Sequence, residues 1–140
     1  MAILTRVFPE QLDEVWELVR HAIEQTTRTP TPEKTNNILK AIVIGSYRCW
    51  AVMEENVLYA VALTSVVSGF GFDRLLLHTF YIYKKLNGTQ LVDLWEQLEK
   101  IAKAAKCEEV IFYTSNEKLC EFVERHGGLL EKFVSIPIGG

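Results

Sequence analysis

The order of elements in the second half of the chain is the feature that most limits its fold. Residues 74–83, dense in leucine and aromatic side chains, are predicted to form a strand, and residues 108–114 another. Between them, apolar residues recur at helical spacing: Leu91, Leu94, Trp95, Leu98, Ile101, Ala102 and Ala105. A strand, a long amphipathic helix and a second strand in succession predict a right-handed crossover between parallel strands.

The first half of the chain predicts antiparallel pairing. A short strand over residues 2–7 is followed by a helix that starts near Pro9, and a second helix starts at Thr31 and Pro32. Residues 47–53 and 57–67 are rich in β-forming side chains and predict a hairpin. We therefore expect most of the sheet to be antiparallel.

The end of the chain predicts one more helix and one more strand. Asn116 or Ser115 caps a short helix, which Gly127 and Gly128 terminate, and residues 130–138 form a last strand. The expected order is β-α-α-β-β-β-α-β-α-β. This is an α/β (α+β) fold with a mixed, mostly antiparallel sheet flanked by helices.

Length and composition are those of one globular domain spanning residues 1–140. The chain has 49% hydrophobic and 24% charged residues, with a formal net charge of −3. It has no cluster of five or more basic residues, which argues against nucleic acid or a membrane surface as partner. The three cysteines, Cys49, Cys107 and Cys120, are odd in number and form no CxxC, so we expect neither a disulfide framework nor a metal site, and a cytoplasmic location.

The segment between the strand 74–83 and the long helix is the best candidate for an anion site. It reads Lys84, Lys85, Leu86, Asn87, Gly88, Thr89 and Gln90. The start of a helix carries unpaired backbone N–H groups and partial positive charge, which suit a pyrophosphate. Gly88 would allow close approach and a lysine would supply countercharge. Taken alone, the segment is equally typical of a solvent-exposed turn.

When this segment is considered together with the order of elements, the chain resembles the GNAT (GCN5-related) N-acetyltransferases along essentially its whole length. The pyrophosphate loop of that family reads Arg/Gln-x-x-Gly-x-Gly/Ala, and the matching residues here are Lys85, Gly88 and Gln90. The central glycine is kept. The last small residue has become Gln90, whose side chain would crowd a pyrophosphate unless it turns aside.

A second family pattern, Asn-x-x-Ala-x-x-Leu-Tyr-x-x-x-Gly-Phe, matches in spacing from Asn116 to Gly127. The position of the tyrosine, which in the family often returns a proton to the departing thiolate, is Val123 here. Gly128 stands where the family has phenylalanine. The resemblance therefore implies the fold more strongly than it implies turnover.

The resemblance also implies a cosubstrate and its contacts. Acetyl-CoA would bind along the loop and the preceding strand, with a backbone N–H near Phe80 or Tyr81 polarising the acetyl carbonyl. The residues expected to hold it are Phe80, Tyr81, Lys85, Leu86, Asn87, Gly88, Thr89, Gln90 and Asn116. No metal is implied.

Four side chains are candidates for proton transfer around that strand: His78, Tyr81, Tyr83 and Tyr113. A histidine titrates in the range that a base needs, and a tyrosine could replace the phenol missing at Val123. Each also has an ordinary structural explanation, because aromatic residues on strands usually serve packing.

Two functions remain open from the sequence. One is an acyl-CoA-dependent N-acetyltransferase acting on a small-molecule or protein amine. The other is a catalytically inactive GNAT-fold protein that serves as a binding or assembly module, as a homo-oligomer or with a partner. Some divergent, phage-encoded members are of this second kind, and a virion-associated location would then replace the cytoplasmic one. Fold alone does not decide between them.

Overall fold

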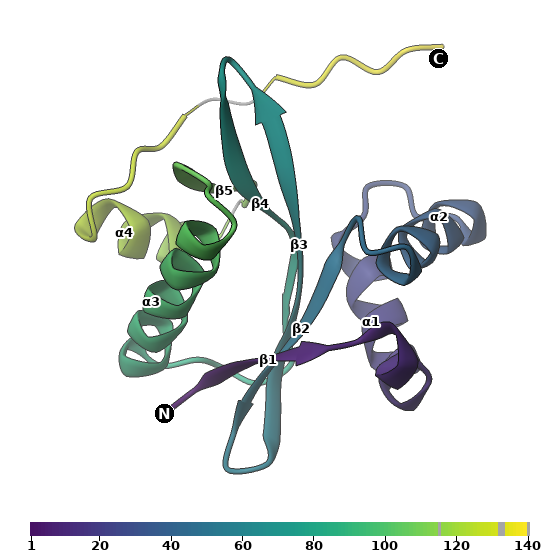
Figure 1. Ribbon diagram of the computed structural model, residues 1–140, viewed down its shortest axis with the longest axis horizontal. Helices are drawn as coiled ribbons and strands as arrows, with labels where there is room; N and C mark the ends of the chain where they lie inside the picture. Colours follow the sequence, from purple (N-terminus) through teal and green to yellow (C-terminus); the bar gives the residue numbers. More distant parts are fainter. Residues whose placement is uncertain (115, 132–133, 140) are drawn as a thin grey trace.

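A five-stranded sheet separates two layers of helices in the computed structural model, which describes residues 1–114, 116–131 and 134–139. Figure 1 shows α1 and α2 on one face of the sheet and α3 and α4 on the other. The strands are β1 (Ile3–Val7), β2 (Arg48–Glu54), β3 (Val57–Gly69), β4 (Phe72–Ile82) and β5 (Glu109–Phe112). The helices are η1 (Pro9–Gln11), α1 (Leu12–Thr26), α2 (Pro32–Val43), α3 (Gly88–Ala104) and α4 (Glu117–Arg125).

The strand order confirms the mixed sheet expected from the sequence. The strands lie in the order β1-β2-β3-β4-β5, and the first three pairings are antiparallel. Strands β4 and β5 are parallel, and α3 connects them. The predicted crossover between parallel strands is therefore confirmed as a connection through α3.

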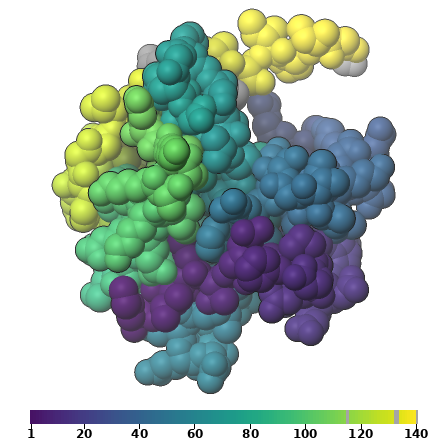
Figure 2. Space-filling model, viewed as in Figure 1, coloured from purple at the N-terminus to yellow at the C-terminus, as the bar shows by residue number. Residues whose placement is uncertain are grey.

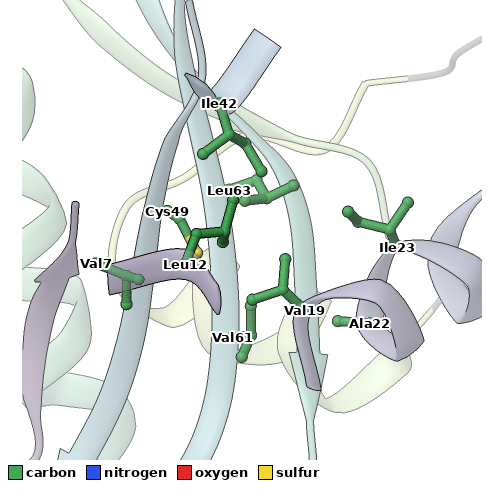
Figure 3. Packing of buried hydrophobic residues seen from close by; sticks show 9 residues of the cluster. All are labelled: Val7, Leu12, Val19, Ala22, Ile23, Ile42, Cys49, Val61 and Leu63. Carbon is green, nitrogen blue, oxygen red and sulfur yellow. The ribbon is translucent and has the colours of Figure 1, made fainter. Parts of the chain in front are cut away.

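The larger core lies between the sheet and the α1–α2 layer. Figure 3 shows α1 directing Val19 and Ile23 toward Leu63 of β3, with Ile42 of α2 above them. Ile23 and Leu63 are fully buried. Cys49 belongs to the same cluster, and burial raises the pKa of its thiol to about 12, so it stays protonated.

A smaller core lies on the opposite face, under α3. Leu86 and Leu94 pack there against Ala2, Val52 and Ala60, with Phe80 and Ile82 of β4 partly buried beside them. Side chains alternate between the two faces of a strand. Phe80 and Ile82 therefore face α3, whereas Tyr81 and Tyr83 pack against the α1–α2 core.

Two helix ends confirm the capping predictions. The Thr31 hydroxyl accepts a hydrogen bond from the Lys34 N–H at 3.1 Å, at the start of α2. At the end of α4, Gly127 has φ +85°, and the Gly128 N–H donates to the Val123 carbonyl at 2.8 Å. A Cβ atom on residue 128 would lie 2.2 Å from Cγ1 of Val123, so the packing here leaves no room for a side chain at this position.

The last strand, predicted over 130–138, is not formed in the described part of that segment. Residues 134–139 have no strand assignment, and Val134, Ile136 and Ile138 are exposed. Figure 2 shows the end of the chain projecting away from the body. Residues 132 and 133, which also fall in the predicted strand, and Ser115, one of the two predicted caps, lie outside the described residues.

Within the described ranges, no helix combines the length and apolar character needed to cross a membrane. All three cysteines are unpaired, with Cys49 buried and Cys107 and Cys120 partly exposed.

Candidate active site

The pairing of β4 with β5 stops partway along β4. Strand β5 pairs with residues 74–77 only, ending with Phe112 opposite Leu77. Strand β4 continues to Ile82, and its other side remains paired with β3 over this stretch. Within the described ranges, β4 therefore has an open edge from residue 78 to residue 82.

The hydrogen bonds to β3 determine which backbone groups point to this open edge. The Tyr83 N–H donates to the Tyr59 carbonyl at 2.8 Å, toward β3. In antiparallel pairing, successive N–H groups alternate between the two sides of a strand. The N–H groups of Phe80 and Ile82 therefore point away from β3, toward the open edge. Of the two residues that the sequence offered, Phe80 has its amide in this direction and Tyr81 does not.

The start of α3 is closed by a capping box. The Asn87 Oδ1 accepts from the Gln90 N–H at 2.8 Å, and the Asn87 N–H donates to the Gln90 Oε1 at 2.9 Å. The Leu91 N–H donates to the Asn87 carbonyl. This leaves Gly88 and Thr89, whose N–H groups have no acceptor within the helix, as the donors that remain at its N-terminus.

Gln90 turns aside from the face that a phosphate would approach. Its side chain is buried, and its Nε2 donates to the Glu54 carboxylate at 2.5 Å. Space in front of Gly88 is open, because a Cβ atom built there would meet no atom within 4 Å. Lys85 is exposed beside the loop, and Lys84 lies with its Nζ 5.7 Å from the centre of the Tyr59 ring.

Glu54 adds a negative charge close to this helix start. Its carboxylate also lies 2.7 Å from the amino nitrogen of Met1. The hydrogen bond from that amino group, followed by the one from Gln90, lowers the pKa of Glu54 below its ordinary value. The carboxylate is therefore ionised at neutral pH and neutralised locally by the amino group.

Comparison with known proteins was informative only at the level of structure. No family model matches the sequence, and no curated protein matches it. Among solved structures, a probable acetyltransferase superposes with a TM-score of 0.71 at 14% identity, covering 99% of both chains. An aminoglycoside N-acetyltransferase in complex with CoA gives 0.68 at 12% identity, covering 99% of this chain and 95% of the other. A ribosomal-protein-alanine N-acetyltransferase from Brucella melitensis biovar Abortus 2308 gives 0.70 at 10% identity, with full coverage of both.

The chain has the fold of the GNAT acetyltransferases. The open edge of β4 and the start of α3 are the two places where the sequence resemblance implied CoA contacts. Within the described ranges, no group of three or more His, Cys, Asp or Glu side chains is arranged to hold a metal ion.

Three of the four proton-transfer candidates lie on β4 or just after β5: His78, Tyr81 and Tyr113. His78 is at the irregular point of the β3–β4 register, where Leu63 pairs with Thr79 and Thr64 with Leu77, so that His78 has no partner. Tyr81 packs edge-on against His21 of α1, with ring centres 5.3 Å apart. Tyr113 follows the end of β5 and is exposed.

The Tyr83 hydroxyl donates to the carbonyl of Leu18 in α1, which ties β4 to that helix. Burial is the largest cause that raises the pKa of Tyr83. We expect Tyr83→Phe to lower the free energy of unfolding by about 1 kcal/mol, since one hydrogen bond is lost. Urea denaturation measures this, with Tyr81→Phe as the matched control on the same face. Equal stability of the Tyr83→Phe and wild-type chains would contradict the assignment.

His78 is exposed, but its ring lies against Tyr47 with centres 5.0 Å apart, and its Nδ1 lies 3.0 Å from the Thr79 hydroxyl. Partial removal from water lowers the pKa of His78 below 6.5. Between the folded and unfolded pKa values the unfolded chain binds more protons, so stability falls as the pH decreases below about 6.5. An NMR titration of the ring should give a pKa below 6.5, and His78→Gln should remove this part of the pH dependence. A folded-state pKa above 6.5 would contradict the prediction.

On the α4 side, Asn116 serves as a helix cap. Its Oδ1 accepts from the Leu119 N–H at 3.2 Å, as one of the two sequence interpretations proposed. Val123 is buried against Gly128. Val123, which stands where the family pattern has tyrosine, is apolar and has no proton to donate.

Three residues near the site have no local signature in the sequence. Glu54 ends β2, and its carboxylate accepts a hydrogen bond from the Gln90 side chain. His21 and Tyr47 lie far from β4 along the chain and contact Tyr81 and His78 only through the fold.

Proposed function

We propose that the chain binds an acyl-CoA and transfers the acyl group to a primary amine. The observation that carries the proposal is the open edge of β4, with the Phe80 N–H directed into it and the N-terminus of α3 at Gly88, six residues after Ile82. Backbone N–H groups held in this way are suited to a carbonyl oxygen at one end and to phosphate oxygens at the other.

The residues of the loop fit the cosubstrate in part. The N–H groups of Gly88 and Thr89 and the ammonium of Lys85 would hold the pyrophosphate, and the open space at Gly88 admits it. The buried position of Gln90 removes the expected crowding. Asn87 and Gln90 satisfy each other and would support the loop from within rather than bind phosphate.

The reaction is aminolysis of a thioester. The Phe80 N–H would polarise the carbonyl, and His78 would accept the proton that the amine loses as the C–N bond forms. The C–S bond then breaks, and the thiolate takes up a proton. Tyr81 and Tyr113 are the candidate donors for that last step, because Val123 carries no proton to give.

The acceptor is a small-molecule or protein amine. Two of the structural neighbours carry names that indicate these classes, an aminoglycoside N-acetyltransferase and a ribosomal-protein-alanine N-acetyltransferase. The proposal extends to the class of amines that these two names share.

Calorimetry with acetyl-CoA tests the proposal. We expect binding with a stoichiometry of one per chain, and slow release of free thiol when a panel of primary amines is added. Absence of heat at millimolar acetyl-CoA would overturn the proposal.

A second function is favoured by Val123 and by the Glu54 carboxylate beside the helix start. Both departures suit a GNAT-fold protein that keeps its scaffold as a binding or assembly module without turnover. Light scattering distinguishes the two, since the assembly role requires a stable homo-oligomer or a complex with a partner. A monomer that binds acetyl-CoA and releases thiol would exclude it.

A further inference from the structure

An apolar cavity of about 50 Å³ lies between the sheet and the α3–α4 layer. Every residue that lines it is apolar, and it presents no polar surface. Such cavities exclude water and bind hydrocarbon groups of matching size. The cavity is therefore a candidate binding site in its own right, separate from the polar groups at the start of α3.

The cavity lies next to the open edge of β4. Leu77 and Phe112, the last pair of the β4–β5 ladder, both line it, and so does the side chain of Phe80. The N–H of the same Phe80 points to the open edge. An acyl group whose carbonyl accepts from this N–H would begin its chain beside the Phe80 ring, at the entrance to the cavity.

Val123 forms part of the wall where the family pattern has tyrosine. It lies against Gly128, where a Cβ atom would lie 2.2 Å from Cγ1 of Val123. A valine side chain is smaller than the phenol it replaces. The same substitution that removes a proton donor therefore leaves apolar space next to the open edge.

We propose that this cavity holds the acyl chain of the donor, and that the preferred donor is a short, unbranched and uncharged acyl-CoA longer than acetyl, such as propionyl- or butyryl-CoA. The inference rests on the proposed function and specifies its donor. A cavity of about 150 Å³ accommodates benzene. A cavity with roughly a third of that volume has room for about two carbon atoms beyond those of acetyl.

The test is a calorimetric series with CoA, acetyl-, propionyl-, butyryl-, octanoyl- and succinyl-CoA. Two methylene groups separate acetyl from butyryl. Burial of each should tighten binding about fourfold. Octanoyl-CoA should gain nothing beyond butyryl-CoA, and succinyl-CoA should bind more weakly than acetyl-CoA because its charge would lie in apolar surroundings.

Leu119→Phe is designed to fill the cavity from α4, and Leu98→Phe fills it from α3 should the first variant fold poorly by circular dichroism. Either should reduce the gain from acetyl to butyryl to less than about twofold. Val43→Phe, at an exposed position of α2 across the sheet, should leave the series unchanged.

Two results would overturn the inference and can be told apart. Measurable CoA binding with no increase from acetyl to butyryl, or with a preference for acetyl-CoA, removes the donor inference and leaves the proposed function. Absence of binding for CoA and for every thioester removes both.

Discussion

Gly88→Glu should weaken acetyl-CoA binding by about 100-fold without unfolding the chain. The new carboxylate would stand in front of the Gly88 and Thr89 N–H groups, where it repels a pyrophosphate at short range. The helix itself should tolerate the change, because no atom lies within 4 Å of a Cβ at this position and an acidic residue is favourable in the first turn. Calorimetry gives the affinity, and circular dichroism confirms the fold.

Gly88→Gln is the matched control for that variant. It has nearly the same shape as Gly88→Glu but carries no charge, so we expect it to retain binding within about tenfold of wild type. Equal affinity of Gly88→Glu and wild type would place the phosphates elsewhere. An equally severe loss of affinity in Gly88→Gln would show that the size of the new side chain, rather than its charge, prevents binding.

Ile23→Ala should lower the free energy of unfolding by about 2–5 kcal/mol. Ile23 is fully buried between α1 and the sheet, so truncation removes buried methyl and methylene groups and leaves a cavity. This is a large share of the stability of an ordinary domain. Urea denaturation should show a lower midpoint with an unchanged slope.

Ile44→Ala removes the same atoms at an exposed position just after α2, where Ile44 is 76% exposed. We expect a change within about 0.5 kcal/mol. A comparable loss in both variants would mean that the α1 face is not the main core. A loss of less than about 1 kcal/mol in Ile23→Ala would likewise mean that the α1 face is not the main core.

The fold could be predicted from the sequence wherever local pattern and tertiary structure agree. The helical spacing from Leu91 to Ala105 sets the crossover, and Thr31 with Pro32 marks the start of α2, as the structure confirms. The predicted last strand is the exception. Val134, Ile136 and Ile138 alternate as in a strand, but a strand needs a neighbour, and alternation alone does not supply one.

The candidate site was less accessible to sequence reasoning, because it depends on register. The stop of β5 at Phe112 and the unpaired position of His78 decide where β4 is open, and neither has a local signature. The position of Gln90 depends on Glu54, which is 36 residues away along the chain. Gly88 could be singled out from the sequence because a glycine at the start of a predicted helix is a local signal.

The most direct test of the coenzyme site is an NMR titration of backbone amides with CoA. We predict that the N–H resonances of Phe80, Ile82, Gly88 and Thr89 shift together and saturate at one CoA per chain, while those of Tyr81 and Tyr83, bonded toward β3, move little. Shifts confined to another surface, or saturation that leaves the Phe80 and Gly88 resonances in place, would contradict the account.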